Sequence, residues 1–411
     1  MEVGIQHSIT DKSKEYGQMR DAQIMIYDAT VVGGGINGLC TLYHLLRLGC
    51  RSVTLIEQFK LGHQQGSSHG TSRITRSSYS SPTYVRLMQQ VHNEEWPRLE
   101  TDLKMKLLHP TPGCFWGPDD GQIRQYAEAV AEMGSNVSRL SPGEARIRFP
   151  MICFSDRDTI LDDSTCALVD ADNTIKALIR TCTEQKAKLL AEESVIDIDF
   201  DSDPIQVKTS ARTLQTQKLA ITTGPWASQL IPTINRRLTI TLQTVGYFEL
   251  VGEHTEFQVG EFPVWIYLGQ GQNNIFYGLP EFGRPGLKLA RHITSASSDA
   301  PEPALGVPTA ENIEDLRHFL AQHFQSPIKR FHSAEHCLYT NTQTEDYILD
   351  FHPSSENVVI GAGFSGHGFK LGPLTGRILA EMLIQGKTTV PAFESDRPRF
   401  RITAPQAGDG S

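Results

Sequence analysis

Two glycine-rich stretches at opposite ends of the 411-residue chain share the spacing G-x-G-x-x-G: "ATVVGGGINGLC" near the start and "NVVIGAGFSGHGFK" near the end. Glycines at this spacing let a chain turn tightly from a strand into a helix, and they let backbone N–H groups approach a phosphate. The chain therefore binds either two nucleotides in two domains, or one nucleotide that both ends of the chain enclose.

The first loop has the surroundings of a dinucleotide site. Residues 29–32 predict a buried strand, the leucine-rich stretch after the loop predicts a helix, and "SVTLIE" predicts a second strand that ends in an acid. The first glycine permits the turn, the second lets the backbone approach the pyrophosphate, and the third lets helix and strand pack closely. The acid would accept hydrogen bonds from the ribose hydroxyls, which favours FAD or NAD over NADP. The predicted contacts are Gly33, Gly35, Ile36, Asn37, Gly38, Glu57 and Gln58.

The second loop, with Gly361, Gly363 and Gly366, lacks the rest of such a unit. The stretch that follows its helix, "IQGKTTVPAFESDRPRF", offers no second strand and no terminal acid. We therefore expect this segment to return to the first sheet and to aim its helix N-terminus at the far end of one shared cofactor. If that end is a flavin, the helix would stabilise negative charge on it. The stretch 218–230 either adds a third contact to this cofactor or is a buried strand and turn.

Four motifs converge on one family: "GSSHGTSRITRSSY" (66–79), "PGLKLARH" (285–292), "CLYTNTQTEDYILDFHP" (337–353) and "NVVIGAGFSGHGFK" (357–370). They resemble the monomeric sarcosine oxidase family of flavoproteins, and the C-terminal motifs look most like the animal peroxisomal sarcosine/L-pipecolate oxidases. The resemblance implies FAD, oxidation of the C–N bond of a secondary amino acid such as sarcosine, L-pipecolate or L-proline, and reduction of O2 to H2O2.

The resemblance also implies an α/β fold, in which a Rossmann-like FAD-binding domain of glutathione-reductase (DAO-like) type is interleaved with a substrate domain on a mixed β-sheet. We expect the FAD-binding domain to comprise 26–108, 166–233 and 330–395, and the substrate domain 109–165 and 234–329. Residues 1–25 would be a mobile extension and 396–411 a C-terminal tail.

Cys337 resembles the family cysteine that forms a thioether to the flavin, a reaction that needs a thiolate. His332 and His336 are close enough in sequence to assist. The alternative is a buried cysteine packed as a small apolar side chain, which is the common situation for a free thiol.

Arg76 and Lys370 match the family pair that binds the substrate carboxylate. An arginine offers a bidentate fork and a lysine a point charge. Both lie in glycine-rich segments with few acids nearby, which favours an external anion over ordinary surface solvation. Arg73 matches a family arginine near the flavin ring, although it could equally pair with a structural carboxylate.

Lys288 matches the family lysine that promotes oxygen reduction. An ammonium fixed about 4 Å from a superoxide anion stabilises it by about 4 kcal/mol at an effective dielectric of about 20. This stabilisation corresponds to about a thousandfold in rate. The alternative is a strand lysine on the surface beside Arg284 and Arg291.

The remaining site residues follow from the same resemblance. His292, Tyr277 and Tyr339 would line the substrate cavity, where His292 could hold the amine or tune its protonation; a lone histidine is more often structural. Bacterial relatives commonly have His-His where this chain has Ser68-His69, so details of redox tuning do not transfer. The further cofactor contacts predicted are Ser67, Ser68, His69, Arg73, Gly363, Gly366, His367, Gly368 and Lys370.

Two other functions remain open from the residues. The protein could be an FAD-dependent dehydrogenase or demethylase that passes electrons to a protein acceptor, against which Lys288 argues. It could also be a flavin-binding module without catalysis, against which the intact set of Cys337, Lys288, Arg76 and Lys370 argues.

Composition excludes several classes of partner. The 47 acidic residues outnumber the 38 Lys and Arg, so no positive field favours nucleic acid, and no apolar run is long enough for a membrane span. Seven cysteines without C-x-x-C spacing predict free thiols inside the cell, and no cluster predicts a metal. We expect a monomer in the cytoplasm or the peroxisome, although the C-terminal "AGDGS" is not an S-K-L-type signal.

Overall fold

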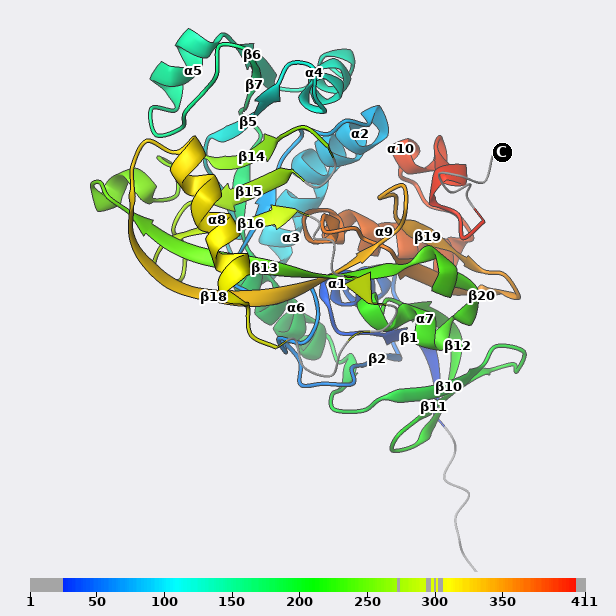
Figure 1. The fold of residues 1–411 in the computed structure, drawn as a ribbon. Coiled ribbons are helices and arrows are strands. Elements are labelled where there is room, and N and C mark those ends of the chain that lie inside the picture. The colour runs from blue at the N-terminus through cyan, green and yellow to red at the C-terminus, as the bar shows by residue number, and fades with distance from the viewer. Residues whose placement is uncertain (1–24, 272–273, 293–296, 299–300, 302–305, 404–411) are drawn as a thin grey trace, which may run out of the picture.

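The computed structural model describes residues 25–403, apart from 272–273, 293–296, 299–300 and 302–305. The expected mobile extension, 1–25, therefore lies almost wholly outside the described residues. Two large sheets and one small sheet form the framework, with the first large sheet at the lower right of Figure 1 and the second at the upper left.

The first sheet contains the strands that lead into both glycine loops. Its centre is five parallel strands in the order β9–β2–β1–β12–β20; β19 joins the β20 edge, and the β10–β11 hairpin extends β12. The second glycine loop thus returns to the sheet of the first, as predicted. The strands are β1 (Ile26–Val32), β2 (Val53–Ile56), β9 (Lys188–Leu190), β10 (Val195–Asp199), β11 (Ile205–Thr209), β12 (Thr213–Ile221), β19 (Ile348–His352) and β20 (Ser355–Ala362).

Helices cover one face of this sheet because its strands are apolar on both sides. Alternate residues of β1 enter different cores: Ala29 and Val31 pack under the helices, and Val32 packs on the opposite face. The covering helices are α1 (Ile36–Arg47), α6 (Ala171–Glu184) and α9 (Gly368–Gln385). Gly49 ends the first of them with φ +92°, as its position after the leucine stripe predicts.

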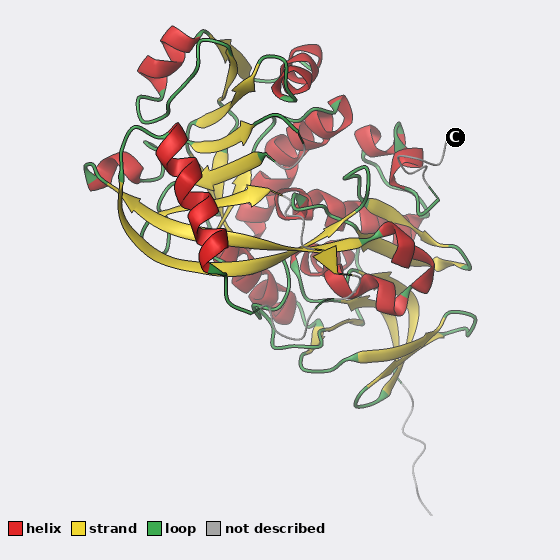
Figure 2. Cartoon of the chain, viewed as in Figure 1, coloured by secondary structure: helices red, strands yellow, loops and turns green. Residues whose placement is uncertain are grey.

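The second sheet is mixed, as predicted. Its order is β17–β13–β16–β15–β14–β5–β7–β6, with β18 paired along β13, and only the β14–β5 pair is parallel among the described pairings. Helix α8 lies across β13 and β18 (Figure 2). The elements are β5 (Gly113–Pro118), β6 (Val137–Leu140), β7 (Asp158–Asp163), β13 (Thr239–Leu250), β14 (Val264–Leu268), β15 (Ile275–Leu279), β16 (Leu287–His292), β17 (Ser297–Ser298), β18 (Ile328–Asn341) and α8 (Ala310–His323).

A small antiparallel sheet joins the two parts, in the order β3–β8–β4. Its strand β3 carries Arg73 and runs into the loop that carries Arg76. The small sheet consists of β3 (Ser72–Thr75), β4 (Leu108–Pro110) and β8 (Ala167–Asp170). The remaining elements are α2 (Pro82–Gln90), the π-helix η1 (Val91–Glu95), α3 (Trp96–Leu103), α4 (Ile123–Glu132), α5 (Pro142–Arg148), η2 (Gly224–Trp226), α7 (Ala227–Leu230), η3 (Pro232–Arg237), η4 (His254–Phe257), α10 (Pro391–Glu394) and η5 (Arg397–Phe400).

Two structural features lie at the predicted domain boundaries. Most of β18 falls in the expected FAD-binding segment 330–395, and β18 pairs with β13 of the second sheet along its whole length. Within the expected tail 396–411, Phe400 is buried, and its ring centroid lies 5.0 Å from that of Phe393. An aromatic side chain that reaches an apolar cluster is held there, so this part of the segment is packed.

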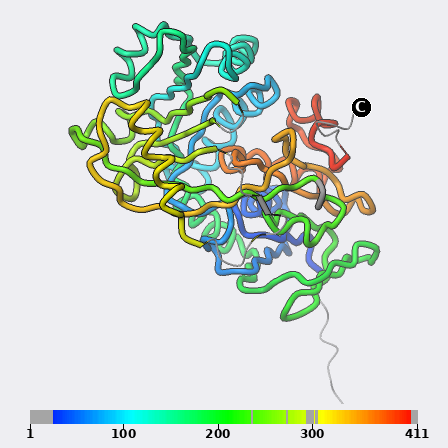
Figure 3. The backbone as a smooth tube through the Cα atoms, in the orientation of Figure 1, coloured from blue at the N-terminus to red at the C-terminus, as the bar shows by residue number. Residues whose placement is uncertain are grey.

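Helices α1 and α9, which follow the two glycine loops, pack closely against each other (Figure 3). Glycines make this approach possible. A Cβ atom added at Gly372 would lie 2.6 Å from Ile36, and one at Gly376 would lie 2.5 Å from the Cβ of Cys40. The N-terminal and C-terminal segments of the chain are therefore joined side by side through the helices that carry the two loops.

Replacing Gly376 by alanine should force these helices apart. The added methyl would overlap the backbone of Cys40 and Thr41, so we expect a loss of about 1–3 kcal/mol in the free energy of unfolding. Chemical denaturation measures this loss. Gly143→Ala in α5 is the matched control, because no described atom outside its own helix turn lies within 4 Å of the new methyl; its stability should be unchanged or slightly higher. Equal denaturation midpoints for the two variants would contradict the close-packing argument.

Candidate active site

Almost all of the predicted site residues line one cavity, which is formed by both large sheets and by β3. Gly38 and Gly363 do not line it, because both serve the packing of the loops. The predicted residues that do line it are Gly33, Gly35, Ile36, Asn37, Glu57, Gln58, Ser67, Ser68, His69, Arg73, Arg76, Tyr277, Lys288, His292, Cys337, Tyr339, Gly366, His367, Gly368 and Lys370.

The first glycine loop has the geometry that the motif predicts. Gly33 adopts φ +104°, and a Cβ there would lie 2.5 Å from the carbonyl oxygen of Thr222. A Cβ at Gly38 would lie 1.9 Å from the carbonyl oxygen of Gly33, so only glycine lets α1 begin this close to β1. The N-terminus of α1 has no cap from its own Ncap residue; instead the hydroxyl of Ser68 accepts a hydrogen bond from the N–H of Ile36 at 3.1 Å.

Glu57 is buried at the end of β2 and anchors the loop. Its carboxylate accepts hydrogen bonds from the N–H of Gly34 at 2.7 Å and of Phe59 at 2.8 Å, and it lies 3.4 Å from His63. Burial raises the pKa of this carboxyl, but the hydrogen bonds from His63, Gly34 and Phe59 together outweigh burial and lower it. Glu57 is therefore a carboxylate with a structural role, in addition to the ribose contact predicted for it.

The second glycine loop ends in a helix N-terminus at the same cavity. Gly363, Ser365 and Gly366 all have positive φ, and a Cβ at Gly366 would lie 2.2 Å from the ring of Tyr339. Helix α9 then begins at Gly368 without a side-chain cap. No strand follows it up to residue 403, which agrees with the reading of this segment as part of one site.

Strands β16 and β18 of the second sheet bring several residues to the cavity. On β18 the residues at 335, 337 and 339 share one face, and on β16 Lys288 lies directly opposite Tyr247 of β13. Glu335, Cys337, Tyr339 and Lys288 all line the cavity, and Leu338 and Thr340 of β18 line it as well. His336 belongs to the other face and hydrogen-bonds Thr244. It does not line the cavity, so its suggested role beside Cys337 is wrong.

His332 does not reach Cys337 either. Its ring nitrogen lies 3.3 Å from a carboxylate oxygen of Glu249, on the part of β18 remote from the cavity. Cys337 itself is buried, and burial raises the pKa of its thiol, whereas the charges of Arg73 and Lys288 lower it. The two cations, rather than the two histidines, are the groups that favour a thiolate here.

Arg76 and Lys370 meet at the ring of Tyr79. The Arg76 guanidinium lies 4.1 Å from the ring centroid, and the ammonium of Lys370 donates a hydrogen bond to the Tyr79 hydroxyl at 3.2 Å. Nε and Nη1 of Arg76 are buried and have no hydrogen-bond partner among the described residues. Burial and the charge of Arg76 hold the pKa of Lys370 well below its usual value. Two buried cations with free donors form a site for an anion.

Lys288 is buried in a second cationic group. Its ammonium donates to the carbonyl oxygen of Ser72 at 2.9 Å, and Arg73 donates to the same oxygen at 2.8 Å. Burial and the charge of Arg73 lower the pKa of Lys288 to about 7. Lys288 is buried, so the reading of it as a surface strand lysine is wrong.

Aromatic and imidazole groups complete the wall. The hydroxyls of Tyr277 and Tyr339 are 3.1 Å apart, and the rings of His292 and Tyr339 are 5.5 Å apart between centroids. Burial and the charges of Arg76 and Lys370 lower the pKa of His292 to about 3, so its imidazole is neutral at neutral pH. Burial, with the charge of Arg73, also lowers the pKa of His69 to about 4, and Nε2 of His69 is buried without a partner among the described groups.

His367, predicted as a cofactor contact, lines the cavity, but its side chain is held by the protein. Both ring nitrogens are engaged by the protein: Nδ1 lies 2.8 Å from the Tyr347 hydroxyl, and Nε2 lies 3.1 Å from the carbonyl oxygen of Glu345. The imidazole fixes the second loop, and any contact with a cofactor would come from its backbone.

Several lining residues were missed in the sequence. Glu335 lines the cavity two positions before Cys337, so strand alternation was the available signal for it. Tyr79, which closes the "SRITRSSY" motif, does not line the cavity but contacts Arg76 and Lys370, which do. Trp226, at the end of "TTGPW", stacks edge-on to Phe59 beside Glu57. Its position in the cavity supports the reading of 218–230 as a third contributor to one site.

The comparisons with known proteins agree with this geometry. A family model described as "FAD dependent oxidoreductase" matches residues 28–382. The chain is 34% identical to the peroxisomal sarcosine oxidase of Mus musculus over 371 residues, which cover 88% of this chain and 93% of that protein. The chain belongs to the sarcosine oxidase family of FAD-dependent oxidoreductases. It is also 30% identical to the monomeric sarcosine oxidase of Bacillus sp. (strain B-0618), over 91% of this chain and 97% of that protein.

Solved structures share the fold. The amino acid oxidase NikD superposes with a TM-score of 0.77 at 23% identity, over 93% of this chain and 98% of the other. L-Proline dehydrogenase from P. horikoshii superposes with a TM-score of 0.74 at 22% identity, over 92% and 98%. The predicted family, fold class and cofactor are thereby confirmed.

The residues of the cavity fit FAD. The glycine cradle at 33–35 and the N-terminus of α1 suit a pyrophosphate. Arg76, His69 and Thr223, which line the cavity farther on, have buried polar atoms without partners among the described groups. Across the described ranges, no group of three or more His, Cys, Asp or Glu could hold a metal ion, and no helix has the length and apolarity to cross a membrane.

The anion site predicts how simple carboxylates bind. Acetate should bind between Arg76 and Lys370 in the holoenzyme and perturb the flavin absorbance. Lys370→Ala should weaken it by about 2–3 kcal/mol, or about 30- to 160-fold, since a charge-assisted hydrogen bond is lost. Lys218, which is half-buried outside the cavity and bonds Asn357, is the matched control, and Lys218→Ala should bind acetate as the wild type does. Unchanged acetate affinity in the Lys370 variant would show that the second loop does not face the anion.

Proposed function

We propose that this protein oxidises the C–N bond of a small secondary amino acid and passes the electrons to O2, forming H2O2. Bound FAD supplies the two-electron acceptor. The observation that carries the proposal is the anion site, where the buried Arg76 guanidinium keeps two donors free beside Lys370. A carboxylate satisfies both cations, so it orients a substrate by one end.

The other end of the substrate would lie against the neutral His292 and the Tyr277–Tyr339 pair. An amine must be uncharged to give up hydride, and a neutral imidazole beside two cations favours an uncharged amine. Ile74, Ile266 and Leu279 add apolar wall and keep water away. These residues bind, orient and desolvate the substrate, and they supply no nucleophile.

The relatives support this substrate class. Their names describe sarcosine oxidases, and the structural neighbours include oxidases and dehydrogenases of amino acids. The preference among sarcosine, L-pipecolate and L-proline depends on the apolar wall. An H2O2-release assay of the purified protein across N-methyl and cyclic amino acids tests the proposal, and no turnover of any of them would refute it.

Lys288 would promote the reaction with O2, since it is a buried cation that lines the cavity and bonds to the β3 strand. Cys337 would hold the flavin through a thioether, since its thiol faces the cavity between Arg73 and Lys288. We extend the proposal to a monomeric protein inside the cell, with the amino acid and O2 as its partners.

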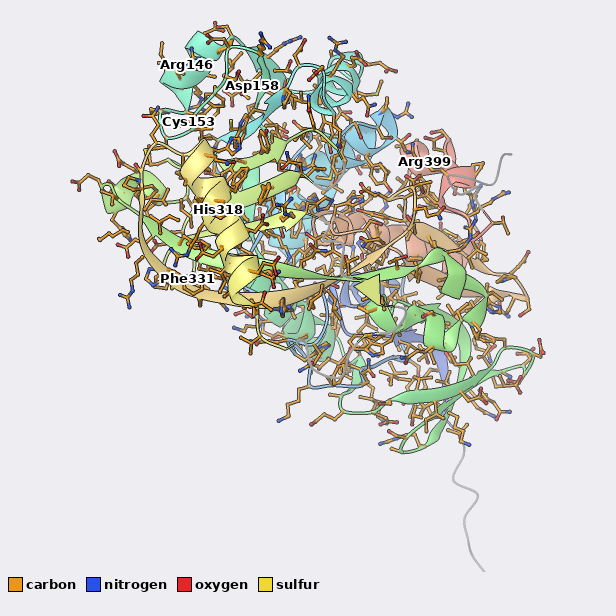
Figure 4. All side chains as sticks on the ribbon, viewed as in Figure 1. Arg146, Cys153, Asp158, His318, Phe331 and Arg399 are labelled. Carbon is orange, nitrogen blue, oxygen red and sulfur yellow. The ribbon has the colours of Figure 1, made fainter. Side chains whose placement is uncertain are left out.

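Denaturation tests the thioether. Acid-precipitated wild-type protein should remain yellow, and Cys337→Ser should release its flavin into the supernatant. Cys153→Ser is the control, because Cys153 is an exposed thiol near α5, at the far end of the second sheet (Figure 4). Free FAD recovered from the wild type would refute the covalent link and leave the noncovalent site untouched.

Reoxidation tests Lys288 and decides between oxidase and dehydrogenase. Lys288→Met should slow reoxidation of the reduced enzyme by O2 by about a thousandfold and change anaerobic reduction by substrate far less. Because the pKa of Lys288 is lowered to about 7, its ammonium is present below pH 7 and lost above it. The wild-type rate should fall as the pH rises through this range, and the variant should lose that dependence. A wild-type enzyme that is reoxidised slowly in air would instead indicate a dehydrogenase with a protein acceptor.

A further inference from the structure

Glu335 is the acidic residue that faces the cationic group of the cavity. The side chains of Arg73, Glu335 and Lys288 all approach Gly70, which has φ +93°. A Cβ added at Gly70 would lie 3.4 Å from Nη1 of Arg73, 3.7 Å from Oε1 of Glu335 and 3.9 Å from Nζ of Lys288. The three charges thus surround the volume of one methyl group, although Glu335 forms no direct ion pair with Lys288.

The second sheet holds this carboxylate firmly. The Tyr247 hydroxyl donates to Oε1 at 2.9 Å, and Arg284 donates to Oε2 at 2.9 Å. The Arg284 guanidinium also stacks 4.7 Å from the centroid of the Tyr247 ring. Tyr247 lies directly opposite Lys288 in the β13–β16 pair, so the carboxylate and the ammonium are presented by one sheet face.

We infer that Glu335 is a positioning residue that keeps Lys288 in its ammonium form by the negative charge it places beside the cavity. This inference rests on the role proposed for Lys288 with O2. Neither the carboxylate nor the ammonium is free to move away, because each has hydrogen bonds to groups other than its partner. The interaction between them therefore acts through space.

Several charged or titratable groups face Lys288. Arg73 and Arg284 oppose its protonation, whereas Glu335 favours it, as would a thiolate at Cys337 before the proposed thioether forms. These groups come from several elements around Lys288. Arg73 lies on β3, and His69 lies in the loop before it. Arg284 lies in the loop before β16, Tyr247 on β13, and Glu335 and Cys337 on β18. Among them Glu335 is the carboxylate, so its removal leaves the two guanidinium charges unopposed.

The test measures the protonation of Lys288 directly. In the oxidised holoenzyme with 13C-labelled lysine, the Lys288 signal is assigned by its loss in Lys288→Met and titrated against pH. Glu335→Gln should lower the titration midpoint by about 1 to 2 pH units, the effect of removing one charge at this separation. Arg284→Gln should raise it, since a cation is removed. Damage to the fold would not move the two variants in opposite directions.

Three further variants complete the design. Glu335→Asp should restore most of the wild-type midpoint, because the charge returns. Tyr247→Phe should lower it less than Glu335→Gln, because the carboxylate stays but loses one anchor. Glu249→Gln is the matched control on the same sheet, where the acid pairs with Lys329 outside the cavity, and it should leave the midpoint unchanged.

A Lys288 midpoint that is the same in Glu335→Gln and wild type would overturn the inference. If Glu335→Gln does not fold, an unchanged midpoint in Arg284→Gln and Tyr247→Phe would do so. The reoxidation rate is measured in parallel. In Glu335→Gln this rate should begin to fall at a lower pH than in the wild type. A shifted midpoint with an unaltered rate profile would support the electrostatic link and refute the role of Lys288 with O2, which separates the two claims.

Discussion

The cavity depends on keeping four cations, Arg73, Arg76, Lys288 and Lys370, out of bulk water in one space. Charges held in this way are costly unless opposite charges or hydrogen bonds compensate them. The protein compensates two of them with the carbonyl oxygen of Ser72 and the charge of Glu335, and it leaves two donors of Arg76 without a partner. Packing of the two large sheets and their helices offsets the cost. The incomplete compensation is the basis on which we propose that the cavity binds an anion.

The two cationic groups are supported in different ways. Arg76 and Lys370 share the face and hydroxyl of Tyr79, so they are held by an aromatic ring that carries no charge. Lys288 and Arg73 are held by a backbone carbonyl and face a carboxylate. The first group therefore remains free to take an anion, whereas the second keeps its own counter-charge. This division matches a substrate carboxylate at one group and oxygen chemistry at the other.

Much of this arrangement could be predicted from the sequence, because it follows from local patterns. The first glycine loop, Glu57 and the helix after it form a compact unit of consecutive residues, and the missing strand after residue 385 was visible as well. Long-range pairing was harder to predict. The place of β18 in the second sheet, and with it the exclusion of His332 and His336 from the cavity, depends on a register against β13 that no local pattern states. Tyr79 and Glu335 were missed because a tyrosine or a glutamate becomes notable only when its neighbours in space are known.

The contact between α1 and α9 has a consequence for how the protein is made. Residues 33–38 leave the ribosome early, but β20 and the helix that begins at Gly368 complete the same sheet and the same cavity. Domains fold as units once their whole chain is available. A nascent chain that ends before residue 370 has the pyrophosphate loop without the opposite wall, so it cannot enclose a dinucleotide. Cofactor loading is therefore a late event in biosynthesis, and translation that stops short of α9 yields a chain that has no enclosed cofactor site.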